Sequence, residues 1–149
     1  MRGWMRASKR DLQRRAQSLL FRRPPKRGLA MSITMENDRG NVYRLEIRGT
    51  LSKRDLDRCQ AALAGEIARV GPVKLLFVLA GFEGWEPHAD WNDLTFFVKQ
   101  GDSIERIAIV GAERWRGEAL MFAGADLRKA PVEFFSDEAA AAARAWLSA

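Results

Sequence analysis

The residues best suited to chemistry lie between positions 82 and 93, where acids surround the only histidine of the chain. They are Glu83, Glu86, His88, Asp90 and Asp93. His88 with Asp90 could begin a metal site or an acid–base pair. Such sites recruit ligands from several elements, however, and the chain has no second histidine and a single cysteine, Cys59. Acids in the first turn of a helix are also favoured by its dipole. We therefore expect no catalytic residue, no metal and no cofactor.

Two further signatures of enzymes are missing from the sequence. Gly81 and Gly84 fit neither of the glycine motifs that bind phosphate, GxGxxG and GxxxxGKS or GxxxxGKT. No serine lies in the pattern of a nucleophile elbow. We therefore predict that the protein is not an enzyme.

The same region is rich in large aromatic side chains: Phe82, Trp85, Trp91, Phe96, Phe97, Trp115 and Phe122. One interpretation is an ordinary hydrophobic core. The other is that residues 88–99 form a helix that acts as a lid over an apolar pocket, with Gly81, Gly84 and Gly101 as hinges. In that case the candidate ligand-binding residues are Phe82, Trp85, His88, Trp91, Phe96 and Trp115.

The elements that must position these residues include a short apolar run. From Val73 to Leu79 only Lys74 is polar, which is typical of a central strand covered on both faces. Residues 32–36 and 42–48 predict a hairpin around the turn sequence NDRGN, and Gly49 is expected to end it.

Two helices flank the apolar run in the prediction. The first begins with Ser52 as N-cap and Asp55 at the third helical position, and Gly71 and Pro72 end it. Its apolar stripe is Leu56, Cys59, Leu63, Ile67 and Val70. The second is the helix over residues 88–99, with Pro87 in its first turn. Its stripe is Trp91, Leu94 and Val98.

The remaining pattern predicts a strand at 106–110, a helix at 113–123, a strand at 132–135 and a terminal helix capped by Ser136. This alternation favours an α/β sandwich with a mostly parallel five-stranded sheet, an N-terminal hairpin and about four helices. Ligands of such sheets gather outside the carboxyl ends of the strands, which directs attention to residues 81–89.

Charge divides the chain into two parts. Residues 1–30 carry ten lysines and arginines and one acid, a net charge of +9, whereas residues 31–149 carry fifteen and eighteen, a net charge of −3. We predict a basic N-terminal extension, 1–30, and one domain, 31–149. The extension could be a disordered arm, a segment ahead of a true start at Met31, or an amphipathic helix that binds an anionic membrane surface. Nucleic acid is not an expected partner, because no recognition motif accompanies these charges.

A cytoplasmic location, with peripheral membrane association as an option, is the expectation for the domain. Its lone cysteine excludes an intramolecular disulfide, which suits a reducing compartment. The longest apolar stretch, residues 75–82, is far shorter than the ~20 residues that span a bilayer. The basic extension lacks the apolar core of a secretory signal, because arginines interrupt it.

Several segments together resemble a known family. They are GTLSKRD at 49–55, GPVKLLFVLAGFEGW at 71–85, ADWNDLTFF at 89–97, RIAIVG at 106–111, Trp115, and the closing EFF and AxxWL at 133–147. Through these segments residues 31–149 resemble the SpoIIAA-like family, bacterial single-domain proteins similar to the STAS domains of sulfate transporters and anti-sigma factor antagonists.

The resemblance implies a STAS-like fold, also similar to CRAL-TRIO lipid-transfer domains, without enzymatic activity. It implies an apolar or lipid-like ligand and membrane association. The alternative that it implies is a protein-interaction module of the anti-sigma factor antagonist type. The phosphorylatable serine of those antagonists has no counterpart, because the segment EPHADW contains neither serine nor threonine. The expected partners are thus a lipid or apolar small molecule, an anionic membrane surface through residues 1–30, or a protein.

Overall fold

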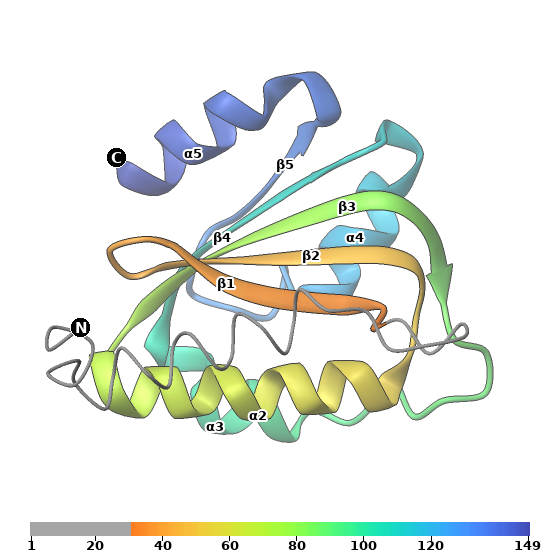
Figure 1. Ribbon diagram of the computed structural model, residues 1–149, viewed down its shortest axis with the longest axis horizontal. Coiled ribbons are helices and arrows are strands. Elements are labelled where there is room, and N and C mark those ends of the chain that lie inside the picture. Colours follow the sequence, from red (N-terminus) through yellow and green to blue (C-terminus); the bar gives the residue numbers. More distant parts are fainter. Residues whose placement is uncertain (1–30) are drawn as a thin grey trace, which may run out of the picture.

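The structure, a computed structural model, describes residues 31–149, which contain one five-stranded sheet (Figure 1). The strands follow one another across the sheet in chain order: β1 (Ile33–Arg39), β2 (Val42–Leu51), β3 (Val73–Trp85), β4 (Ile104–Gly111) and β5 (Val132–Ser136). β1 is antiparallel to β2, and β2 to β5 are parallel. The predicted sheet with its initial hairpin is confirmed. The predictions for residues 1–30 lie outside the described residues.

Helices cover both faces of this sheet. Residues 31–149 contain α2 (Lys53–Val70), α3 (Thr95–Gln100), α4 (Arg116–Phe122) and α5 (Ala140–Ser148), with the short 3-10 turns η2 (Gly101–Ser103), η3 (Glu113–Trp115) and η4 (Asp137–Ala139). The helices α2, α3 and α4 lie on one face and α5 lies on the other (Figure 1). β3, β4 and β5 are each added on the same side of the preceding strand. Right-handed crossovers that proceed in one direction across a sheet place their connecting helices on the same face.

β3 is the centre of the sheet, as the apolar run predicted. β2 and β4 pair with it on its two sides. Leu75 belongs to the large core beneath α2, whereas Leu76 packs with Ala143 and Leu147 of α5 on the opposite face. Each of these side chains is almost fully buried, so both faces of β3 are covered.

The N-terminus of α2 is anchored to the start of β1 and the end of β3. Ser52 Oγ accepts a hydrogen bond from the Asp55 amide (3.1 Å), which confirms the predicted cap. The Asp55 carboxylate accepts hydrogen bonds from the amide and the hydroxyl of buried Ser32 (both 2.8 Å). The Lys53 amide donates to the Glu86 carboxylate (2.9 Å). Burial raises the pKa of Asp55, but the hydrogen bonds from Ser32 and Ser52 outweigh it, and the pKa falls below its ordinary value.

The structure differs from the sequence prediction at the end of β3. This strand continues to Trp85, so Gly81 and Gly84, which the sequence suggested as hinges of a lid, lie within a strand of the sheet. Both glycines have positive φ, 62° and 115°, where the pairing of β3 with β2 shifts its register. Such bulges bend a strand while its ladder continues.

The predicted helix over residues 88–99 is confirmed only from Thr95 onward, where α3 begins, and is wrong for residues 88–94. His88 has a φ of 66°, which a right-handed helix does not accept. Pro87 therefore lies in a loop and not in a first helical turn.

Acidic side chains of this loop hold its backbone in turns. Asp90 Oδ1 accepts a hydrogen bond from the amide two residues further on (3.2 Å), and Asp93 Oδ1 does the same with Thr95 (3.1 Å). Bonds of this kind compete with helix formation. The acids that the sequence suggested for a helical first turn instead shape the loop before α3.

Smaller predictions also fail. The strand does not end at Gly49 but continues to Leu51. Val70, Leu94 and Val98 were assigned to apolar stripes and are exposed. Ser136 makes no side-chain capping bond, because a 3-10 turn separates it from α5.

Candidate functional site

A cavity of about 640 Å³ lies on the face of the sheet that α2, α3 and α4 cover. Its apolar wall consists of Leu45, Leu56, Leu63, Leu75, Phe77, Trp85, Trp91, Leu94, Phe96, Phe97, Ile104, Ile107, Met121, Phe122, Ala123, Gly124 and Leu127. Its polar wall residues are Lys53, Gln60, Asn92, Asp93, Glu118 and Arg128. This volume and this mostly apolar composition are typical of small-molecule sites.

The lengths of the helices explain why this space exists. Leu45, Leu75 and Ile107 line the core face of three neighbouring strands, and α2 covers part of that face with Leu56 and Leu63. By contrast, α3 has six residues, none of them buried, and α4 has seven. Two such short helices cannot fill the rest of the face. Apolar side chains therefore surround an open volume.

Aromatic side chains form one part of the wall. The ring centroids of Trp85 and Trp91 lie 5.6 and 6.2 Å from the ring centroid of Phe122. Phe82 and Trp115 contact Trp85 at 4.9 and 5.9 Å between ring centroids. The aromatics of residues 82–91 and those of residues 115–122, separated by some thirty residues in sequence, thus form one cluster.

The six predicted ligand-binding residues fall into three groups. Trp85, Trp91 and Phe96 line the cavity. Phe82 and Trp115 pack behind that wall. His88 is exposed and lies outside the wall. Whether any of them binds a ligand stays a prediction.

Sequence reasoning missed two kinds of wall residue. Phe97 and Phe122 were noticed as aromatic but not assigned to the pocket, and the spacing of aromatics could have suggested both. Arg128 was missed altogether, because it follows α4 in a stretch without any motif.

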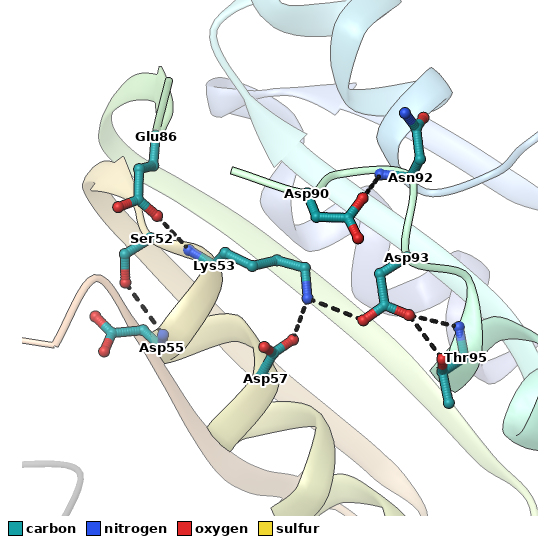
Figure 2. A network of polar contacts seen from close by, with 9 residues as sticks. All are labelled: Ser52, Lys53, Asp55, Asp57, Glu86, Asp90, Asn92, Asp93 and Thr95. Carbon is teal, nitrogen blue, oxygen red and sulfur yellow. Dashed lines mark hydrogen bonds and ion pairs between the residues drawn. The ribbon is translucent and has the colours of Figure 1, made fainter. Parts of the chain in front are cut away.

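A polar network joins α2 to the segment before α3 (Figure 2). The Lys53 ammonium pairs with Asp57 and with Asp93, the latter at 3.3 Å. The second oxygen of Asp93 accepts hydrogen bonds from the Thr95 hydroxyl (2.7 Å) and amide (3.1 Å). The bonds from Thr95 and then Lys53 lower the pKa of Asp93 to about 2, and the bond to Asp57 raises the pKa of Lys53 despite desolvation. Both charges of this pair are therefore satisfied at the edge of the cavity.

Arg128 is bound differently from Lys53. Its Nε donates to the Ala123 carbonyl (2.6 Å), and its guanidinium lies over the Phe97 ring at 4.5 Å. Its Nη1 is enclosed and has no hydrogen-bond partner. Burial lowers the pKa of Arg128. Trp85 Nε1 is the second enclosed side-chain donor of residues 31–149 without a partner, and it too belongs to a wall residue.

The acids around His88 do not converge on a common point. Within residues 31–149, no group of three or more His, Cys, Asp or Glu side chains is arranged to hold a metal ion. Glu86 accepts the Lys53 amide instead, and Asp93 binds Lys53 and Thr95. Glu86 and Asp93, which are close in the sequence, therefore serve in separate structural contacts.

The rim of the cavity carries exposed apolar side chains. Leu94, Met121 and Leu127 are wall residues and are 52%, 78% and 70% exposed. Large apolar side chains that are exposed beside a cavity are a feature of interaction sites. No helix in the described range 31–149 has the length and apolar character needed to cross a bilayer.

Residues 42–148 match the family model described as SpoIIAA-like. The chain belongs to the SpoIIAA-like family. The matched range includes every residue of the cavity wall. No curated protein matches the sequence of this SpoIIAA-like chain closely enough to count as a relative.

A solved structure is similar to this SpoIIAA-like chain. It is an uncharacterised protein of the DUF3478 family with a SpoIIAA-like fold from Shewanella loihica PV-4. The TM-score is 0.60 and the sequence identity 23%, over 77% of this chain and 91% of that one. At this identity the likeness supports the fold, and the fold predicted from the sequence motifs is confirmed.

Proposed function

We propose that this SpoIIAA-like domain is a non-enzymatic protein that binds an apolar or lipid-like small molecule in the cavity beneath α3. The observation that carries the proposal is a volume of about 640 Å³ with a mostly apolar wall. Transfer of a methylene group from water into such a wall is worth ~0.8 kcal/mol. A ligand with a long hydrocarbon part would gain most from it.

The charges of the wall argue against a small, highly polar ligand. The Lys53 ammonium pairs with Asp57 and Asp93, and the Asp93 carboxylate also accepts a hydrogen bond from Thr95. Gln60, Asn92, Glu118 and Arg128 are the other polar wall residues, too few to replace the whole water shell that a highly polar ligand would lose on entering, and buried polar groups without partners are costly.

A fluorescence titration tests the proposal. Delipidated full-length protein is titrated with octanoate, decanoate and dodecanoate, and tryptophan emission is followed. Trp85 and Trp91 line the cavity and should report binding, whereas Trp146 lies on the other face of the sheet beside Phe135. Affinity should rise about fourfold for each methylene added.

Two substitutions serve as a matched pair in this titration. Trp91→Phe should reduce the signal, and Trp146→Phe should leave the ligand-dependent change intact. Absence of any saturable change in the wild-type protein, together with no co-purifying lipid by native mass spectrometry, would refute ligand binding.

Membrane contact is the second part of the proposal, and the exposed apolar rim of the cavity supports it. Leu94, Met121 and Leu127 are exposed around the opening. The +9 charge of residues 1–30 suits an anionic leaflet, where each lysine or arginine is worth about 1 kcal/mol. Co-sedimentation with anionic vesicles should be stronger for the full chain than for a chain beginning at Met31. Equal sedimentation of the two would remove the role of the extension.

The alternative function is a protein-interaction module of the anti-sigma factor antagonist type, and the same exposed rim supports it. Such a module would not use a phosphorylation switch in the loop before α3, because residues 86–94 contain no serine or threonine. A filled cavity in protein purified from its own host favours the ligand; an empty one together with a stoichiometric protein complex favours the module.

A further inference from the structure

We propose that the ligand of the cavity carries an anionic oxygen head group, such as a carboxylate or a phosphate, and that Arg128 binds it. This inference rests on the proposed function, because it names the chemical class of the molecule that would fill the cavity. The hydrocarbon part of the ligand would occupy the apolar wall, and Arg128 would fix the position of its polar end.

Arg128 is the wall cation without a counter-charge. The wall contains four charged side chains: Lys53, Asp93, Glu118 and Arg128. Lys53 pairs with Asp93 and Asp57. Within residues 31–149, no carboxylate makes an ion pair with Arg128, and Glu118 is exposed. A permanently charged guanidinium in an apolar wall favours an anion among the molecules that could enter.

The unpaired hydrogen-bond donors of the wall also favour a ligand with oxygen acceptors. A buried N–H group without an acceptor is costly, and such groups are rare in folded proteins. In the described part of the chain only two side-chain donors are enclosed without a partner, Arg128 Nη1 and Trp85 Nε1. Both belong to residues that line this cavity. A ligand with oxygen acceptors would satisfy donors that the protein leaves unpaired.

The geometry of Arg128 suits this role. Its Nε donates to the Ala123 carbonyl (2.6 Å), and its Cζ lies 4.5 Å from the centre of the Phe97 ring. These contacts restrict the side chain and leave in-plane N–H groups unused, and a guanidinium binds carboxylates and phosphates through such groups. Phe97 belongs to α3, which has no buried residue. A small shift of α3 would therefore give an anionic group access to Nη1.

The test compares ligands that differ only in their head group. Delipidated full-length protein is titrated with dodecanoate, dodecyl phosphate and dodecanol below their aggregation limits, with tryptophan fluorescence as the signal. Arg128→Met removes the charge, and Arg128→Lys keeps the charge without the planar group. Arg114→Met is the matched control, because Arg114 lies over the Trp115 ring at 5.1 Å but not in the cavity wall. Near-ultraviolet circular dichroism checks that each variant is folded.

Wild-type protein should bind at least one anionic ligand about tenfold or more tightly than dodecanol. The dodecanoate and dodecyl phosphate arms then show which head group fits better. Arg128→Met should lose about tenfold to a hundredfold of the anion affinity and change dodecanol affinity by less than about twofold. The anion affinity of Arg128→Lys should lie between those of the wild type and Arg128→Met, and Arg114→Met should behave as wild type.

Two results would overturn the inference in distinguishable ways. Equal wild-type affinity for dodecanol and both anions, or an equal loss for all three in Arg128→Met, would eliminate the anchor and leave the apolar ligand proposal standing. No saturable binding of any of the three would eliminate the proposed function, and the anchor with it. The wild-type comparison can still overturn the inference if a variant fails to fold.

Discussion

Replacement of Gly124 by alanine tests how closely α3 packs over the turn that follows α4. Gly124 has a φ of 71°, and a Cβ at this position would lie 2.8 Å from Phe97 Cε2 and 3.4 Å from Phe97 Cδ2. Carbon atoms prefer separations of ~3.5–4.0 Å, so the Phe97 ring must move by about half an ångström or more. That ring also lies over the Arg128 guanidinium.

Two costs add in this variant. A left-handed backbone costs a residue with a side chain ~1–2 kcal/mol. Loss of the contact between Phe97 and Arg128 adds about 0.5–1 kcal/mol. Gly81→Ala is the matched control, because Gly81 has a φ of 62° and a Cβ atom added there would meet nothing within 4 Å. It should lose only the backbone contribution.

Urea unfolding followed by far-ultraviolet circular dichroism measures both free energies of unfolding. Gly124→Ala should lose about 0.5–1 kcal/mol more than Gly81→Ala. Hydrogen exchange of the α3 amides should become about two- to fivefold faster in Gly124→Ala and stay unchanged in the control. Equal losses of stability, with equal exchange in α3, would refute the close packing of Phe97 on Gly124.

Three further predictions follow from the core and from α2. Gly111→Ala should cost ~1–3 kcal/mol in urea unfolding, because its Cβ would lie 2.8 Å from Leu79 Cδ1 and 2.9 Å from Leu79 Cβ in a packed core; an unchanged midpoint would contradict this. The pKa of Asp55 is lowered on folding, so its stabilising effect is present above the unfolded value of 3.8 and is lost as the pH falls through the lower folded value. The stability difference between wild type and Asp55→Asn should therefore be constant near neutral pH and shrink in strong acid, and a difference independent of pH would disprove the role of the charge. Burial, and then the charge of Asp55, raises the pKa of the Cys59 thiol to about 12. At about pH 8, thiol reagents should therefore modify the folded protein at least a hundredfold more slowly than the urea-unfolded chain. Similar rates would show that Cys59 is accessible.

The sheet was predictable because its signals are local and strong. The run from Val73 to Leu79 has almost no polar side chain, and a segment of that kind is stable only when both of its faces are covered. The start of α2 was predictable for a similar reason, since Ser52 and Asp55 form a cap within a single turn.

The loop before α3 was not predictable from the same kind of pattern. Trp91, Leu94 and Val98 have helical spacing, yet only Trp91 is even partly buried. Trp91 is held by its bond to the Glu86 carbonyl (2.8 Å), and Asp93 binds Lys53 of α2. These contacts join residues that the three-dimensional fold brings together, and they outweigh a weak local preference for helix.

Part of the cavity wall could be anticipated and part could not. Trp85 and Phe96 stand in an aromatic-rich segment, and large rings near the carboxyl end of a central strand are natural wall residues. His88 attracted attention as the only histidine of the chain and lies outside the wall. Arg128 has no distinguishing neighbour in the sequence, and only the tertiary structure places it over the Phe97 ring with Nη1 enclosed and unpaired.

By itself, the sequence determined the succession of strands and helices along the chain, the central place of β3, the cap of α2 and the family, because each follows from the residue types of short segments. Only the tertiary structure decided where β3 ends, how short α3 is, and that a large apolar volume remains beneath it. The physical reason is that a cavity is what side chains from several elements fail to fill. That remainder depends on how the elements pack together, and no local pattern of residues encodes it.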